Sequence, residues 1–499
     1  MAVKPRSRAV IEQFAESTVD SDYSPIKSLS ISRLPDDQVL IYVATVSGVL
    51  FLYSLRTSQS SPQIAFVRRA SLPGAGGEGS VSSIHALAHI GKIIVVSDGL
   101  LFLVDSSLLE PAKKLSLFKG VTAFSRRFGS PGYASAFSRG HNNGVEVGNS
   151  IAIGSGRKLI LAELILSGSL VIQKEIQGGF DGGVLLTLLW IDDSIFFGTR
   201  SGYYLYKYST GKCGLIFSFP EEASFIPQLK LFSKESRVLL VTDNVGIVVD
   251  LEGDPFGGSL VFNGVPDMLK ETGSYVVASR GLAVELYHKK TGCCVQRVAV
   301  GNGTEGHCLL ADEEIENGKY IFIATSFKSS ISKSKLICYS KVSEEEQIKD
   351  LLRKKHFKEA ISLVEELENE GDITKEMLSF VHAQVGLLLL FDLQFREAID
   401  HFLLAENMQP LEVFPFILRD PNRWTLLVPR NRYWGLHPPP KLLENVVDDG
   451  LNALQRAVFL KSTGVDAPFG NGFLQNPPSR ADLLQSAIEN MIRHVHLVI

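Results

Sequence analysis

The feature that most constrains the fold of this chain is a strand–turn–strand pattern that recurs through residues 1–341. Each copy is an apolar run, a short polar turn and a second apolar run. Seven copies occur, at residues 39–53, 92–105, 150–164, 194–208, 237–251, 274–287 and 319–339. The turns are rich in Gly, Asn, Asp and Ser, which suit the positive φ angles of tight hairpins. The pattern therefore predicts seven β-hairpins.

The spacing of these hairpins predicts how they assemble. Neighbouring copies are about 40 to 55 residues apart, which is typical of β-propeller blades of about four strands. Radial repetition also leaves only short sheet edges exposed, which suits a large β-rich protein. A pair of β-sandwiches is the alternative, but seven similar hairpins favour a closed ring. We therefore expect a seven-bladed β-propeller over residues 1–341.

The apolar pattern changes to helical spacing at Ser343. Ser343 and the three glutamates after it have the form of a capping box, which starts a helix. A motif with the sequence F-(K/R)-E-A-I then occurs at residues 357–361 and again at 395–399, about 38 residues later, as in stacked helical hairpins. Neither hairpin can bury its apolar face alone, so we expect an α-solenoid.

The helical part divides further by composition. Residues 342–425 are expected to hold the hairpin repeats, residues 426–440 a proline-rich linker, and residues 441–499 further solenoid helices. The last expected helix ends without a capping pattern, so we expect it to expose an apolar face. On this basis we interpret the helical part as the start of a solenoid that is truncated.

Composition excludes several classes of function. The net charge is only −4, which gives no electrostatic case for binding nucleic acid or an anionic membrane. Uninterrupted apolar runs, such as residues 387–391, are far shorter than the roughly 20 residues that span a bilayer, so any membrane association is expected to go through partners. The five cysteines are odd in number and include no C-x-x-C, which predicts reduced core thiols in a cytosolic protein.

The search for catalytic or cofactor motifs is negative. Gly74, Gly76 and Gly79 spell G-x-G-x-x-G, but β-forming residues follow them, so we interpret the segment as an inter-strand loop rather than a dinucleotide site. His85 and His89 are four residues apart in a β-type run without a metalloprotease glutamate, which indicates packing. We predict no catalytic, cofactor-binding or metal site, and no enzyme activity.

One further segment is a candidate for contacts with other proteins. Residues 125–149 are rich in Gly, Ser and Asn and include Arg126, Arg127 and Arg139. We predict a solvated surface loop, with use of its arginines by a partner as the alternative. No individual partner-binding residue is assigned from the sequence.

Taken together, these residues resemble a known family. The run S-E-E-E-Q-I-x-D-L-L that begins at Ser343, the F-K-E-A-I motif after it, and the blocks at 392–402 and 413–416 are similar to vacuolar protein sorting subunits of the CORVET and HOPS tethering complexes. Within that family the sequence is most similar to the branch called transforming growth factor-beta receptor-associated protein, the CORVET-specific subunit. The resemblance is strong over residues 340–425 and diffuse over the propeller, and it implies that the propeller is of the citron homology type.

The resemblance implies a non-enzymatic tether in vesicle-mediated transport to the vacuole or lysosome. It implies a cytoplasmic protein, peripheral on the endosome or vacuole membrane, whose propeller region engages an endosomal Rab-type GTPase and whose solenoid joins the class C core tethering subunits. Neither cofactor, nucleic acid nor small-molecule substrate is implied. A signalling scaffold that binds receptor or kinase tails stays open as an alternative, and so does the choice between CORVET and HOPS.

Overall fold

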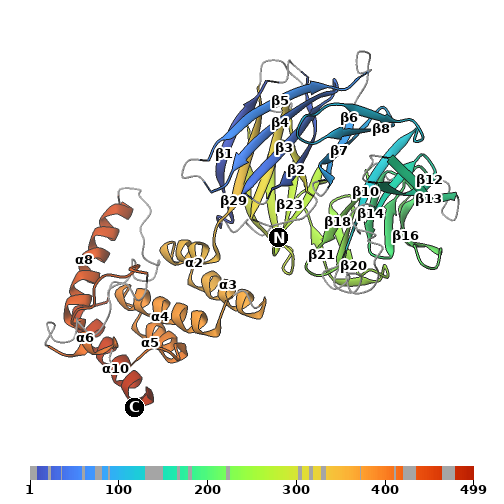
Figure 1. Cartoon of the computed structure of the whole chain (residues 1–499). Helices are drawn as coiled ribbons and strands as arrows, with labels where there is room; N and C mark the ends of the chain where they lie inside the picture. Colours follow the sequence, from blue (N-terminus) through green and yellow to red (C-terminus); the bar gives the residue numbers. More distant parts are fainter. Residues whose placement is uncertain are drawn as a thin grey trace. The chain divides into compact units, whose positions relative to one another are not determined.

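The computed structural model describes residues 8–20, 24–34, 36–58, 62–73, 81–87, 90–129, 150–165, 169–177, 183–220, 225–301, 306–313, 319–327, 333–370, 373–409, 412–419, 434–462 and 478–498. The chain forms two compact units, Met1–Val342 and Ser343–Ile499. The first unit is built from strands and the second from helices (Figure 1).

The strands of the first unit form antiparallel groups of four, which we call blades and number in chain order. Blade 1 consists of β2 (Ile26–Arg33), β3 (Gln38–Thr45), β4 (Val49–Arg56) and β5 (Ile64–Ser71). Blade 2 consists of β6 (Val81–Leu87), β7 (Lys92–Ser97), β8 (Leu100–Asp105) and β9 (Ala112–Leu115). Blade 3 consists of β10 (Val121–Phe128), β11 (Ser150–Ser155), β12 (Lys158–Ile165) and β13 (Ser169–Gln177). Blade 4 consists of β14 (Thr187–Ile191), β15 (Ser194–Gly198), β16 (Gly202–Lys207) and β17 (Cys213–Ser218). A short parallel contact between β10 and β14 joins blades 3 and 4 into one sheet.

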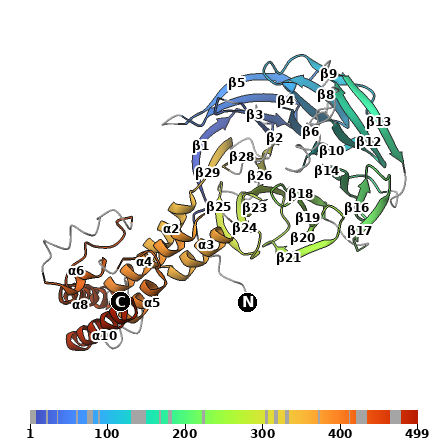
Figure 2. The same cartoon turned by 60° about the horizontal axis from the view of Figure 1, so that its bottom comes forward.

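The remaining strands complete the set. Blade 5 consists of β18 (Gln228–Phe232), β19 (Arg237–Thr242), β20 (Val245–Val249) and β21 (Pro255–Val261). Blade 6 consists of β22 (Met268–Thr272), β23 (Tyr275–Arg280), β24 (Ala283–His288) and β25 (Cys294–Ala299). Blade 7 is β26 (Gly306–Leu310), β28 (Tyr320–Phe327), β29 (Ser334–Lys341) and β1 (Ile11–Val19), while the two-residue β27 (Asp312–Glu313) pairs with β2 of blade 1. The blades radiate around a common centre (Figure 2), so the predicted β-propeller is confirmed.

Each hairpin that the sequence predicts forms the two middle strands of one blade. In blade 1, for example, the hairpin at residues 39–53 is β3 and β4, with Ile41 opposite Tyr53. The predicted turn residues adopt positive φ where the hairpins reverse, as at Asp98 (φ 50°) in blade 2 and Asp243 (φ 57°) in blade 5. The residues predicted from the sequence to form turns are therefore the ones at which these hairpins reverse.

The hydrophobic core of the propeller lies between blades rather than inside them. Alternate residues of a middle strand face opposite neighbours: in β3, Tyr42 and Ala44 pack toward blade 2, whereas Ile41 and Val43 pack toward blade 7. A buried apolar cluster of this kind joins every consecutive pair of blades, including blades 7 and 1. Burial at about 25 cal/mol per Å² makes these clusters the main stabilising term of the ring.

The ring closes by pairing the first strand of the chain with the last. β1 forms the outer strand of blade 7 and runs antiparallel to β29, from Ile11 opposite Lys341 to Val19 opposite Ser334. The side chain of Gln296 in blade 6 holds the start of β1: its Oε1 accepts from the backbone N–H groups of Val10 (2.7 Å) and Ile11 (2.9 Å), and its Nε2 donates to the carbonyl of Ile11 (2.9 Å).

We expect Gln296→Ala to destabilise the propeller by about 1–3 kcal/mol, because the substitution leaves buried backbone groups of Val10 and Ile11 without partners. The check is the free energy of unfolding from urea titration. Gln173→Ala is the matched control, since Gln173 is exposed and its hydrogen bond to Glu163 is open to solvent, and it should change stability by less than about 0.5 kcal/mol. Equal effects of the two substitutions would show that Gln296 does not anchor β1.

The second unit is a set of packed helices that follows the propeller, as the helical spacing of the sequence predicts. Its helices are α2 (Glu344–Arg353), α3 (Phe357–Glu370), α4 (Lys375–Phe391), α5 (Phe395–Leu404), α6 (Phe414–Ile417), α8 (Leu443–Ser462) and α10 (Arg480–Val498). Ser343 caps α2 by accepting from the N–H of Glu346 (3.3 Å), while the carboxylate of Glu346 pairs with Lys349 instead of returning to the cap. No helix in the described part of the chain is long and apolar enough to cross a bilayer.

The two F-(K/R)-E-A-I motifs lie at the starts of α3 and α5, and their alanines are fully buried. A feature that the motif does not reveal is Gly386 in α4. A Cβ at Gly386 would lie 2.5 Å from the ring of Phe402 and 2.9 Å from the carbonyl of Ala398. Close packing of α4 on α5 therefore depends on a glycine in the middle of a helix.

Replacing Gly386 with alanine has two opposite effects on stability. Alanine favours an isolated helix by up to about 1 kcal/mol, but here the added methyl group overlaps Phe402, and we expect a net loss of about 1–3 kcal/mol. Thermal unfolding followed by circular dichroism at 222 nm measures the result. Gly214→Ala is the control, because a Cβ there meets nothing within 4 Å; a stabilised Gly386→Ala would show that α4 and α5 are not closely packed.

Candidate functional site

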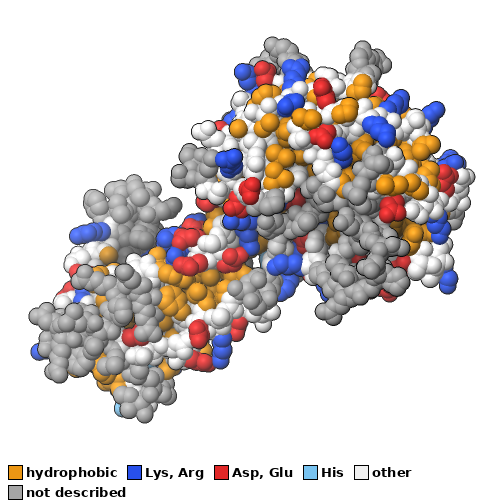
Figure 3. Space-filling model, viewed as in Figure 1, with side chains coloured by type: hydrophobic (Ala, Val, Ile, Leu, Met, Phe, Trp, Pro, Cys, Tyr) orange, Lys and Arg blue, Asp and Glu red, His pale blue; other side chains and the backbone are white. Residues whose placement is uncertain are grey.

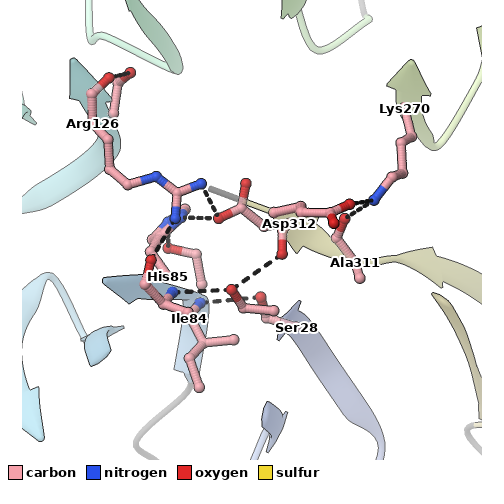
Figure 4. Close-up of polar contacts among 12 residues, drawn as sticks. Ser28, Ile84, His85, Arg126, Lys270, Ala311 and Asp312 are labelled. Atoms are coloured by element: carbon pink, nitrogen blue, oxygen red, sulfur yellow. Dashed lines mark hydrogen bonds and ion pairs between the residues drawn. The ribbon is translucent and has the colours of Figure 1, made fainter. Parts of the chain in front are cut away.

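A polar cluster occupies the centre of the propeller and is organised by β27. This short strand pairs in parallel with β2, with Ser30 opposite Asp312. Asp312 meets side chains from several blades, as Figure 4 shows, and Glu313 pairs with Arg33 and Lys270. Because the innermost strands converge here, residues far apart in the sequence become neighbours. We call this set, made of His85, Arg126, Lys270, Asp312 and Glu313, the axial cluster.

One half of the axial cluster surrounds the carboxylate of Asp312. Its Oδ2 lies 3.0 Å from Nδ1 of His85 in β6 and 3.1 Å from Nη2 of Arg126 in β10. Arg126 is only 4% exposed and also donates to the carbonyl of Ala86 (2.6 Å). The hydroxyl of Ser30 donates to the carbonyl of Asp312 (3.2 Å). Asp312 thus connects blades 1, 2 and 3.

The electrostatics of this half favour an ionised carboxylate. Burial acts to raise the pKa of Asp312, but the guanidinium of Arg126, the hydrogen bond with His85 and the cation of Lys230 outweigh it, so the pKa of Asp312 is held well below its usual range. The side chain is nevertheless 36% exposed, so solvent reaches it although protein atoms surround it.

The other half of the axial cluster is a buried ion pair. Nζ of Lys270 in β22 lies 2.6 Å from Oε2 of Glu313, and both side chains are almost completely buried. Oε1 of Glu313 accepts from Nε of Arg33 in β2 (2.5 Å), so one carboxylate holds two cations. Lys270 is also near the carbonyl of Ala311 (3.4 Å). These contacts connect blades 1 and 6 through β27.

The contacts of the axial cluster hold strands of different blades in position. Its carboxylates are paired with Arg and Lys cations, so their oxygen atoms are occupied by these contacts. Within the described ranges, no group of three or more His, Cys, Asp or Glu side chains is placed to hold a metal ion. The arrangement fixes the innermost strands of blades 1, 2, 3 and 6 around β27.

The structure corrects the predicted arginine-rich loop at residues 125–149. Arg126 and Arg127 belong to β10, where alternate side chains point to opposite faces. Arg126 is buried against Asp312, and Arg127 donates from Nε to the carbonyl of Asp192 (3.0 Å) beside the ring of Trp190. These two arginines are therefore not available to a partner. Arg139 lies outside the described residues.

The other residues singled out from the sequence divide between the described and undescribed parts of the chain. His85 was expected to serve packing, and its ring does lie 4.6 Å from that of Phe124, but it also contacts Asp312. His89 and the three glycines at 74, 76 and 79 lie outside the described residues.

The five cysteines are free, as expected for reduced thiols, but they are not all in the core. Cys308 and Cys338 are buried, and burial raises the pKa of each thiol to about 12, which makes them unreactive. Cys293 is exposed, so the prediction of a core position is wrong for it. It lies in the turn before β25, where its backbone N–H donates to the hydroxyl of Thr291 (3.4 Å).

Sequence reasoning missed the acidic half of the axial cluster. The only local signal is that Asp312 and Glu313 directly follow the apolar run Cys308–Ala311, where a strand is leaving the core. Nothing in that signal indicates that their partners lie in β2, β6, β10 and β22, because those contacts depend on how the ring brings strand ends together.

We expect Asp312→Asn to destabilise the propeller at pH 7, since it leaves the buried Arg126 without a counter-charge. The loss should be about 1–3 kcal/mol, below the figure for a fully buried pair because solvent reaches Asp312. The pKa of Asp312 is lowered by folding, so its contribution is complete well above the unfolded-state pKa of about 3.9 and is lost as the pH falls below it.

Urea unfolding of the wild type and of Asp312→Asn at several pH values tests this. The two curves should differ at pH 7 and converge in acid. Asp243→Asn is the control, because Asp243 has an exposed side chain in a turn where Asn tolerates the same positive φ. A pH-independent difference for Asp312→Asn would contradict the assignment of an ionised Asp312.

The chain thus combines a β-propeller with a polar cluster at its centre and a unit of packed helices. The model of the CNH (citron homology) domain matches residues 37–312, more than half of the chain. The chain therefore belongs to the CNH domain family.

The chain is also similar to a longer relative. It is 44% identical over 533 aligned residues to "Vacuolar sorting protein 3" of Arabidopsis thaliana, in an alignment that covers 99% of this chain and 52% of the relative. The chain thus spans about half the length of this curated relative. Among solved structures, the AfRom2 CNH domain is 12% identical with a TM-score of 0.45, covering 67% of this chain and 99% of that one. The Neurospora crassa Pan2 WD40 domain is 11% identical with a TM-score of 0.47, covering 68% and 98%.

Proposed function

We propose that this chain is a non-enzymatic subunit of a CORVET-like membrane-tethering complex in protein sorting to the vacuole. The observation that carries the proposal is the 44% identity to vacuolar sorting protein 3, which extends over 99% of the chain and so includes both the propeller and the helices. The axial cluster supports it indirectly, since its charges are used to hold blades together and leave no catalytic arrangement among the described residues.

The proposal assigns different partners to the two units. The propeller, residues 1–341, binds an endosomal Rab-type GTPase. The helices begin an α-solenoid that joins the class C core tethering subunits, with hairpin repeats over 342–425, a linker at 426–440 and further helices over 441–499. Stacked helical hairpins suit this role because each hairpin offers its uncovered face to the next. The protein is then cytoplasmic and peripheral on the endosome or vacuole membrane.

A capture experiment tests the GTPase assignment. The tagged chain is incubated with a panel of purified endosomal Rab-type GTPases, each loaded with a non-hydrolysable GTP analogue or with GDP, and the bound GTPase is quantified. We expect one member to bind at least tenfold more tightly in the GTP form, because switch segments ordered by the γ-phosphate create the recognised surface. The absence of a nucleotide-dependent partner would contradict the proposal.

A variant in the helical unit distinguishes binding of the GTPase from binding of the core tethering subunits. Gly386→Leu places a large side chain where even a Cβ lies 2.5 Å from Phe402, so it should disrupt the α4–α5 hairpin and leave the propeller folded. In affinity purification from cytosol followed by mass spectrometry, this variant should retain the GTPase and lose core tethering subunits. Recovery of receptor tails or kinases in place of both would favour the signalling scaffold.

A further inference from the structure

The outer edge of blades 1 and 2 is positively charged, in contrast to the chain as a whole. Residues 56–73 and 106–120, which include β5, β9 and the turns beside them, contain a single acidic residue, Glu110, although the whole chain has a net charge of −4. The Lys and Arg residues of these segments are Arg56, Arg68, Arg69, Lys113, Lys114 and Lys119.

Strand register places two of these cations on the same side of the edge. Arg68 of β5 stands opposite Leu52, and Lys114 of β9 stands opposite Phe102. Opposed residues of a strand pair share a face, and Leu52 and Phe102 both belong to the apolar cluster between blades 1 and 2. Arg68 and Lys114 therefore project from the two blade faces that meet each other, at the outer end of that cluster, and both are exposed.

Large apolar side chains lie beside these cations. Val67 directly precedes Arg68 and is 48% exposed, and Leu108, in the turn before β9, is 50% exposed. Phe66 (58%) and Leu117 (72%) are also exposed on these segments. Figure 3 shows Lys, Arg and hydrophobic side chains, with some Asp and Glu side chains among them, over the part of the propeller where β4, β5 and β8 lie in Figure 1.

Protection of sheet edges does not explain this composition. Charged residues on an outer strand do prevent edge-to-edge pairing, but the outer strands of blades 4 and 5, Cys213–Ser218 and Pro255–Val261, contain no charged residue at all. The outer strand of blade 7, Ile11–Val19, is acidic. Two adjacent cations on each of two neighbouring outer strands are thus specific to blades 1 and 2.

We propose that this edge, which we call the basic edge, binds the surface of an anionic phospholipid membrane directly. Basic side chains gain about 1 kcal/mol each near such a surface, and exposed apolar side chains among them gain by entering the interfacial region. A bilayer satisfies both kinds of side chain at once, whereas an acidic protein segment would satisfy the cations and leave Val67 and Leu108 in water. This contact goes beyond the proposed function, in which membrane association runs through partner proteins.

Vesicle flotation with the purified full chain and no other protein tests the proposal. Vesicles of phosphatidylcholine are compared with vesicles to which phosphatidylserine has been added, at low and at physiological salt. The chain should float with the anionic vesicles only, and binding should weaken as salt screens the charges. Arg68→Glu with Lys114→Glu should reduce binding about tenfold or more.

Two matched variants make the result specific. Lys212→Glu with Lys234→Glu changes the net charge equally at exposed positions of blades 4 and 5 and should leave binding unchanged. Val67→Ser keeps the charge and should weaken binding several-fold if apolar contact contributes. All variants are first matched to wild type in thermal unfolding.

Other outcomes would overturn the proposal. Equal flotation with neutral and anionic vesicles, or equal loss in the two double variants, would exclude a membrane contact at the basic edge. Retention on an immobilised poly-glutamate resin without vesicle binding would assign the surface to an acidic protein instead. Because no GTPase or tethering subunit is present, failure here leaves the proposed function untouched, and loss of GTPase capture leaves this contact untouched.

Discussion

The antiparallel pairing of β1 with β29 is the interaction on which the propeller depends. Each blade buries its two faces only against two neighbours, so an open row of blades would expose the faces of its two end members. Joining strands more than 300 residues apart costs loop-closure entropy, but this cost grows only logarithmically with length. The apolar cluster between blades 7 and 1 forms only when that closure is made, and its burial offsets this cost.

Closure of the ring also explains why its centre is polar. The first strands of neighbouring blades converge without forming a continuous ladder, so some of their backbone N–H groups need other partners. Serine hydroxyls of β2 supply them: Ser28 accepts from the N–H of Ile84 (3.1 Å), and Ser30 accepts from that of Ala86 (3.0 Å). β27 then adds the carboxylates that pair with Arg126 and Lys270. The axial cluster is therefore a consequence of radial geometry, and its charges replace hydrogen bonds that a flat sheet would make.

Much of this fold could be predicted from the sequence, because its rules are local. The seven hairpins follow from period-two apolar runs and turn residues such as Asp98 and Asp243, and the helices follow from Ser343 and the two alanine motifs. The axial cluster could not be predicted in the same way. Asp312 and Arg126 are 186 positions apart, and only the ring brings them together. Arg126 was misassigned to a loop because the Gly- and Ser-rich residues after it obscure the end of β10.

Interaction surfaces are harder to predict for a related reason. Core positions must alternate to fill the spaces between blades, so their pattern is legible in the sequence. The outermost strand of a blade has one free edge and few packing constraints, as the mostly exposed residues of Pro255–Val261 illustrate. Its composition can therefore differ from blade to blade without cost to the ring. Net charge averages over these differences: the cations of β5 and β9 are cancelled by glutamates and aspartates elsewhere in the chain. A surface of this kind becomes visible only when strand register shows which side chains share an edge, as it does for Arg68 and Lys114.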